Sequence, residues 1–338
     1  MQIQYINNLR AVACYLVVLT HSAMPALDPS FGMFMVLFSI ISSPSSELFI
    51  MISSSLLAPA KLDMLSFYRK RFDKLLWPFF FWSIVLLVIG YFKNGSSITE
   101  LITRILQIPL VPATGIYWFI YVIAGLYLII PIISPWLKNC SKKELGTILL
   151  FWGITLLLPF YNVIAEKDLY KMDGDYYFTF VYLGGFIGYL FLGVYLRRYP
   201  IIFTSKLKNI LFIILTTILG TLPILYAYII NRNAIEPLYD HLSISSVFYV
   251  LAIYCFFQNF EIPPYLQKMF NAIAKYSFGI YLIHIIVIRD VIWKLLENFR
   301  IPHPIIETPL ISIFSLIICF YIVKAITFLP KSKYIIGA

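Results

Sequence analysis

Charged side chains are scarce in this chain. Asp, Glu, Lys and Arg together supply 12% of its 338 residues, hydrophobic residues supply 61%, and mean hydropathy is +0.86. Soluble domains typically have about 25% charged residues, so the composition excludes an ordinary soluble protein. Repeated apolar runs of about 20 residues instead predict an all-α, polytopic helical bundle in a membrane.

Paired cysteines are also lacking. The four cysteines, Cys14, Cys140, Cys255 and Cys319, include no closely spaced pair. We therefore expect no disulfide, no metal site and no tightly bound cofactor. No internal repeat is evident, so nothing indicates an inverted-repeat transporter.

The apolar runs predict ten membrane spans in a single domain that covers residues 1–338. The spans lie at 9–25, 47–60, 75–91, 116–133, 145–161, 178–196, 210–230, 242–260, 276–294 and 309–329. The short apolar stretch 31–41 is expected at the outer surface or as a re-entrant segment. The loop 93–115 is expected to hold an amphipathic helix near 98–108. The first run lacks the flanks of a signal peptide, so we expect it to remain as a span.

The distribution of basic residues predicts the orientation. If the first residues are cytoplasmic, 18 of the 26 Lys and Arg residues fall on the cytoplasmic side of the ten spans. The positive-inside rule therefore favours cytoplasmic termini. The net charge of +10 then forms a rim that faces anionic lipid, and nucleic acid is not an expected partner.

The segment from Tyr5 to Ser22, YINNLRAVACYLVVLTHS, places an arginine and a histidine in the first predicted span. Arg10 and His21 are eleven residues apart, so they lie roughly 20° apart on one helix face and about 16 Å apart along it. Arg10 can stay at an interface while His21 lies near the middle of the membrane. A titratable group at that depth is a candidate for function, although a structural histidine that bonds a neighbouring helix is the alternative.

A basic cluster occupies the segment FYRKRFDKLLWP, at the cytoplasmic mouth of the third predicted span. Arg71 and Lys74 are three residues apart and share a helix face, and Arg69 precedes them. Clustered Arg and Lys side chains can hold phosphates. The alternative is ordinary positive-inside decoration.

Other polar or aromatic residues lie at span ends or within spans. Glu47 opens the second span, where it is expected to cap the helix or to pair with a basic group or His21. Trp118 lies near an outer interface, where such residues usually form an aromatic belt. His284 lies at mid-membrane depth in the ninth span, whereas His241 and His303 lie in predicted outer loops, where a solvated role is expected.

Five segments, in order, resemble the acyltransferase-3 family of membrane acyltransferases. The first is the Arg10–His21 segment, and the others are SELFIMISSSLL, FYRKRFDKLLWPFF, YWFIYVIAGLYLIIPII and YSFGIYLIHI. The likeness covers most of the chain. Within the family, the chain resembles compact O-acetyltransferases such as that of enterobacterial common antigen. One departure is that Ser54 follows Ser53, where the family usually has Ser-Gly.

The resemblance implies transfer of an acyl group, usually acetyl, from cytoplasmic acyl-CoA to a hydroxyl of a surface glycan or lipid-linked sugar. The enzyme would reside in a bacterial cytoplasmic (inner) membrane. His21 would act as general base or transient acyl carrier, and Arg10 would hold the donor or a developing negative charge. The substrate-binding candidates are Arg71 and Lys74 for the donor phosphates, then Arg69, Glu47, Trp118, Tyr127 and His284.

Two other classes share the many spans and the buried polar groups. One is a transporter or flippase of a lipid-linked sugar, and the other is a membrane subunit of a polysaccharide synthesis machine. Release of coenzyme A from acetyl-CoA would separate an acyltransferase from a flippase, and activity of the purified chain alone would separate it from a subunit.

Overall fold

In a computed structural model of the chain, the described residues are 4–23, 34, 38, 40–157, 160, 185–230, 241–297, 299, 301 and 303–337. They form helices with no strand among them, which agrees with the predicted all-α class. Most of the surface segment expected at 31–41 and the first part of the sixth predicted span lie outside these residues.

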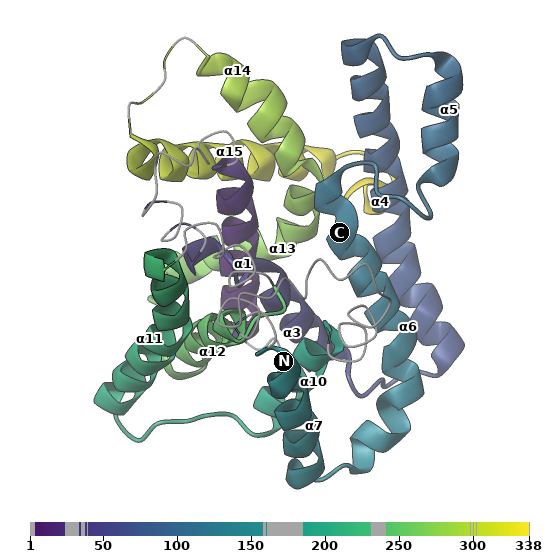
Figure 1. The fold of residues 1–338 in the computed structure, drawn as a ribbon. Helices are drawn as coiled ribbons and strands as arrows, with labels where there is room; N and C mark the ends of the chain where they lie inside the picture. The colour runs from purple at the N-terminus through teal and green to yellow at the C-terminus, as the bar shows by residue number, and fades with distance from the viewer. Residues whose placement is uncertain are drawn as a thin grey trace.

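The helices are short turns and long rods in one bundle (Figure 1). They are α1 (Gln4–Ser22), α3 (Ser45–Leu57), α4 (Met64–Asn94), α5 (Ile98–Gln107), the 3-10 turn η3 (Gly115–Tyr117), α6 (Trp118–Asn139), α7 (Lys142–Thr155), α10 (Ile187–Arg198), α11 (Lys206–Ile230), α12 (Ile244–Asn259), α13 (Pro264–Ile286), the π-helical stretch η7 (Val287–Ile292), α14 (Trp293–Leu295), α15 (Pro304–Ile326) and α16 (Lys333–Ile336). The amphipathic helix expected near 98–108 is α5.

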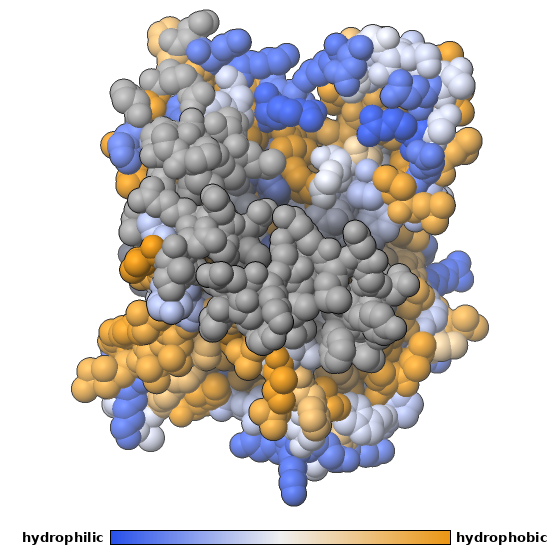
Figure 2. Space-filling model, viewed as in Figure 1, coloured by the Kyte–Doolittle hydropathy of each residue, from blue (hydrophilic) through white to orange (hydrophobic). Residues whose placement is uncertain are grey.

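Five helical stretches in the described part are long and apolar enough to cross a membrane, at 40–57, 64–94, 115–139, 206–226 and 304–326. Figure 2 shows hydrophilic residues gathered at the upper and lower ends of the view and hydrophobic residues on the flanks between them. This distribution is that of a membrane protein. The count of ten crossings and the cytoplasmic termini stay predictions.

Helix α1 is the centre of the bundle. It packs against α3, α12, α13 and α15, and most of its side chains are buried. In Figure 1 it stands in the middle, with α4, α5 and α6 to the right and α11 and α12 to the lower left. A helix that is buried on nearly all sides can carry polar side chains only where another helix or a cavity receives them.

Helices α1 and α13 run parallel in a fixed register. At one end, Asn7 Nδ2 donates to Asn271 Oδ1 at 3.0 Å, and Gln267 Nε2 donates to Asn8 Oδ1 at 2.5 Å. In the middle, the Cys14 thiol points at the Ser277 carbonyl, 3.9 Å away. Further along, the two helices bring the rings of His21 and His284 together. The predicted spans one and nine, which overlap these helices, would both be odd-numbered and so run in the same direction.

Helix α4 begins earlier than the predicted third span at 75–91. Asp63 caps it by accepting from the Ser66 amide at 3.0 Å, which holds the pKa of Asp63 below its ordinary value. Gly95, at φ +63°, ends it. The 31 residues of α4 make a rod of about 46 Å. The basic cluster is therefore part of the same rigid helix as the apolar span.

Helices α3 and α10 approach closely despite the serine at position 54. A Cβ atom at Gly193 would lie 2.2 Å from the Ser54 hydroxyl oxygen and 2.6 Å from the Met51 carbonyl oxygen. The missing side chain is thus on α10 rather than on α3. The Ser55 hydroxyl donates to the Gly193 carbonyl at 3.0 Å and completes the contact.

Candidate functional site

Two cavities occupy the region around α1. The first, the basic cavity, has a volume of about 470 Å³ and is lined by Arg10, Phe49, Ser53, Arg71, Lys74, Leu75, Phe119, Ile120, Ile123, Tyr127, Ala274, Lys275, Ser277, Phe278, Tyr281, Ile336 and Gly337. The second, the histidine cavity, has a volume of about 590 Å³ and is lined by His21, Thr114, Gly115, Ile116, Trp118, Ile285, Arg289 and Trp293. Both sizes lie in the range of small-molecule sites.

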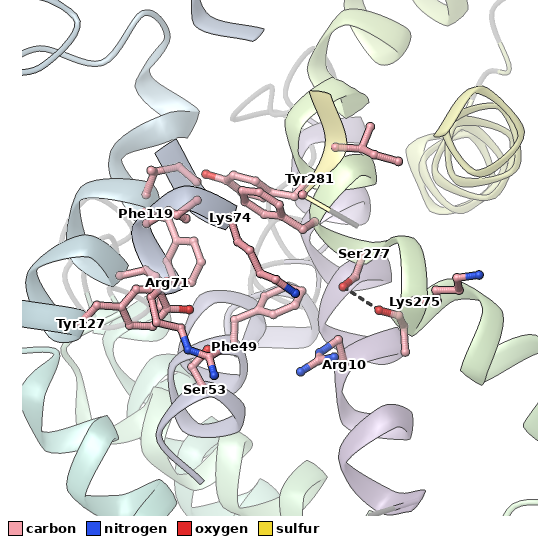
Figure 3. A pocket seen from close by; sticks show the side chains of 17 residues that line it. Arg10, Phe49, Ser53, Arg71, Lys74, Phe119, Tyr127, Lys275, Ser277 and Tyr281 are labelled. Atoms are coloured by element: carbon pink, nitrogen blue, oxygen red, sulfur yellow. Dashed lines mark hydrogen bonds between the residues drawn. The ribbon is translucent and has the colours of Figure 1, made fainter. Parts of the chain in front are cut away.

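Four basic residues line the basic cavity. The side chains of Arg10, Arg71 and Lys74 point into it (Figure 3), whereas the Lys275 ammonium lies 5.2 Å from the centre of the Tyr276 ring. Arg10 comes from α1, and Arg71 and Lys74 come from the second and third turns of α4, while Tyr127 of α6 lies beside Arg71 (Figure 3). Among the described residues that line this cavity, none is acidic. The arrangement is suited to an anion, because opposite charges are absent from the lining.

The Arg71 side chain lies against an aromatic ring. Its guanidinium lies 5.8 Å from the centre of the Phe67 ring. Its Nε atom is buried and makes no hydrogen bond to any described residue. A buried donor without an acceptor is costly, so a ligand with anionic oxygens would relieve it.

The two histidines predicted within spans are in contact. The ring centres of His21 and His284 are 5.2 Å apart, with 40° between the ring planes. His284 is fully buried, and its Nδ1 lies 2.5 Å from the Tyr281 carbonyl oxygen. Because a carbonyl only accepts, Nδ1 carries the proton and Nε2 carries the lone pair. Nε2 makes no hydrogen bond to any described residue, so this nitrogen could accept a proton.

An aromatic layer separates the two cavities. Tyr281 lines the basic cavity, and its hydroxyl donates at 2.7 Å to the carbonyl of Ile116, which lines the histidine cavity. The Tyr281 ring centre lies 5.9 Å from that of Phe119 and 5.7 Å from that of His284. Beside it, the Tyr117 hydroxyl donates to the Leu282 carbonyl at 2.6 Å. The layer is therefore held by hydrogen bonds that join η3 and α13.

Arg10 and His21, predicted on one face of one helix, open into different cavities. Arg71, Lys74 and Tyr127 share the cavity of Arg10, whereas Trp118 shares that of His21. Arg69 is exposed on α4 and lines neither cavity. The roles assigned to these residues stay predictions.

Glu47 does not cap α3. The N-cap position is Pro44, without a side-chain cap, and Glu47 is fully buried with Oε1 2.7 Å from His241 Nδ1. The ring centre of His241 lies 5.0 Å from that of Trp118. The capping alternative for Glu47 was wrong, and the pairing alternative is the one observed, with His241 as the partner. His241 lies in a loop with a partly exposed side chain, so the solvated role expected for it is met only in part. Glu47 reaches the histidine cavity indirectly, through His241 and Trp118.

Sequence reasoning missed several lining residues. Ser277 and Tyr281 line the basic cavity, and Trp293 lines the histidine cavity. The segment YSFGIYLIHI contains Ser277 and Tyr281, so its polar side chains at helical spacing were the available signal.

His303 caps α15, with Nδ1 accepting from the Ile305 amide at 3.3 Å.

The family comparison agrees with the resemblance seen in the segments. A family model described as an acyltransferase domain matches residues 3–324. Because that match spans nearly the whole chain, the protein belongs to the acyltransferase-3 family. The family is membrane-bound, so the chain is a membrane acyltransferase in its general class. No curated protein and no solved structure matches the chain.

Proposed function

We propose that this protein is an integral membrane O-acyltransferase of a bacterial cytoplasmic membrane. It moves an acyl group, acetyl in the first instance, from acyl-CoA to a hydroxyl of a surface glycan or lipid-linked sugar. The observation that carries the proposal is the pair of cavities. The described lining of one includes four basic residues and no acid, and the other is lined by His21, whose ring is in contact with that of His284.

In this proposal the basic cavity holds the donor. The phosphates of coenzyme A bind Arg71 and Lys74, because guanidinium and ammonium groups form short charge-assisted bonds to phosphate oxygens. Arg10 holds the donor nearer to α1 or stabilises negative charge on the thioester oxygen. Phe49, Phe119 and Ile120, also in the lining, provide the apolar surface for the less polar part of the donor.

The histidine cavity receives the acceptor. Aromatic faces such as those of Trp118 and Trp293 suit the apolar face of a sugar ring. The acceptor hydroxyl oxygen forms a bond to the acyl carbon while the carbon–sulfur bond breaks. His21 removes the hydroxyl proton, and the coenzyme A thiolate takes that proton as it leaves. The products are an ester and coenzyme A.

A carrier route is the alternative within the same function. The imidazole of His21 first displaces the thiolate and holds the acyl group, and the acceptor hydroxyl then attacks this acyl-imidazole. Both routes require the thioester and a histidine to meet at the aromatic layer. Only the carrier route leaves label on the protein when the acceptor is omitted.

The test uses the purified full-length chain in lipid vesicles with acetyl-CoA labelled in its acetyl group. Vesicles that contain lipid-linked saccharide from a bacterial envelope extract should form a labelled, base-labile ester and release an equal amount of coenzyme A. A flippase would move the saccharide and leave acetyl-CoA intact. A synthase subunit would be inactive without its machine. Either result would overturn the proposal.

A further inference from the structure

One wall of the basic cavity is formed by the segment that follows α15. It lies outside the five segments that resemble the family. This segment contains α16 (Lys333–Ile336) and Gly337, and it lies beyond residues 3–324, the part that the family model matches. In Figure 1 it is the yellow stretch beside α4. It packs against both α4 and α13 and so fills the space between the helix of the basic cluster and the helix of His284.

Two contacts with α4 and one buried side chain hold this segment in place. The Trp82 indole donates to the Ile335 carbonyl at 2.9 Å, and the ring centres of Trp77 and Tyr334 lie 6.0 Å apart in an edge-to-face arrangement. The Ile336 side chain is 1% exposed. A hydrogen bond from the Trp82 side chain of α4 and the buried Ile336 side chain hold this wall in a fixed position.

Ile336 and Gly337 line the basic cavity and pack tightly against α4 and α13. A Cβ atom at Gly337 would lie 2.7 Å from the Phe278 ring and 2.9 Å from the Lys74 carbonyl oxygen, and the φ of +70° at this position favours glycine. A Cβ atom at Gly279 would lie 3.2 Å from Ile336 Cβ. The wall therefore leaves no spare room between α4 and α13.

The wall and His284 are close along the axis of α13 but lie on different sides of it, because five residues separate Gly279 from His284 and this is roughly 140° around the helix. On α13, Phe278 and Gly279 precede Tyr281 by three and two residues, and His284 follows at the contact with His21. At about 1.5 Å per residue, Gly279 is about 7.5 Å from His284 along the helix. The Ile336 side chain is apolar, unlike those of Arg10, Arg71 and Lys74, which line the same cavity. An acyl chain is the part of the donor that would pack against it.

We propose that Ile336 and Gly337 limit the size of the acyl group that the basic cavity accepts. This inference rests on the proposed function, because it assigns acyl selectivity to a wall of the donor site. A pocket discriminates by about 10- to 200-fold for a methylene that it cannot accommodate. Shortening Ile336 should therefore admit longer acyl groups.

The experiment compares the kcat/KM of butyryl-CoA with that of acetyl-CoA for the purified full-length protein. In Ile336→Ala the butyryl-to-acetyl ratio should rise about tenfold or more, and in Ile336→Val it should rise by less. Val323→Ala is the matched control. Val323 is buried and also packs against Gly279, but it does not line the cavity. Its ratio should not change.

The outcomes separate the two proposals. A wild-type protein that transfers no acyl group from any acyl-CoA would overturn the proposed function and this inference together. A wild-type protein that is active, with an unchanged ratio in both Ile336 variants, would overturn the inference alone. An equal rise in Val323→Ala would also overturn it, because general loosening would then explain the change. If Ile336→Ala does not accumulate, the Ile336→Val result decides.

Discussion

Replacing Arg71 with alanine tests the basic cavity most directly. The change removes a guanidinium that lines the cavity and whose buried Nε has no acceptor among the described residues. If that group binds a donor phosphate, the lost charge-assisted hydrogen bonds cost about 1.5–3 kcal/mol. At about 1.4 kcal/mol per tenfold change, the apparent KM for acyl-CoA should rise roughly 10- to 150-fold. kcat should change little, because the interaction is made before and during the reaction alike.

Arg69→Ala is the matched control for this prediction. Arg69 lies on the same helix, two residues earlier, and loses the same charge, but it is exposed and lines neither cavity. Exposed charges typically contribute about 0–1 kcal/mol, so its KM should change less than about fivefold. Arg71→Lys keeps the charge without the planar fork and should lie between the two.

The assay is steady-state transfer of labelled acetyl from acetyl-CoA at fixed acceptor, together with equilibrium binding of coenzyme A to the same preparations. Binding should weaken in Arg71→Ala by the same factor as KM rises. Equal effects of Arg69→Ala and Arg71→Ala would refute the reasoning, since the basic cluster would then act only through its general charge. An unchanged KM in both alanine variants would indicate that the basic cluster serves only membrane orientation, as the positive-inside rule describes.

Three further predictions concern other parts of the chain. His21→Ala and His21→Gln should both lower ester formation per inserted protein by about 10²–10⁴-fold, and near-normal activity of the Gln form would shift attention to His284. Gly193→Ala should lower the thermal midpoint in detergent, because overpacking typically costs about 1–3 kcal/mol. Gly125→Ala, with nothing within 4 Å of the added carbon, should not. A reporter fused after residue 338 should be active in the cytoplasm, and activity only outside would contradict the ten-span orientation.

Local chemistry made part of the site predictable. Three charged residues lie in or beside apolar runs: Arg10, Arg71 and Lys74. A charged side chain in such a run is stable only at a membrane interface or in a polar cavity. The common cavity of these three residues was therefore within reach of the sequence, and the depth of His21 in the membrane stays a prediction. The helical class followed from the same apolar runs, because backbone groups in lipid need internal hydrogen bonds.

The rest depended on contacts between distant segments. The Glu47–His241 pair joins residues 194 positions apart, and nothing near Glu47 distinguishes that partner from a helix cap. The separation of Arg10 from His21 depends on Tyr281 lying between the two cavities. Ile336 and Gly337 are an apolar residue and a glycine at the end of a short helix, and only tertiary packing brings them to the basic cavity.

The amide contacts between α1 and α13 restrict the tilt between these two helices, and a small change of tilt at the amides becomes a larger displacement at the histidines. Asn7 and Asn271 are hydrogen-bonded at one end, and His21 lies fourteen residues further along α1, beside His284. That separation is about 21 Å, so a tilt of about 5° around the amides would move the two imidazoles by about 2 Å relative to one another. The alignment of the histidines is therefore set partly by uncharged side chains at the opposite end of the helices, and loosening those amides would misalign the imidazoles without touching either ring.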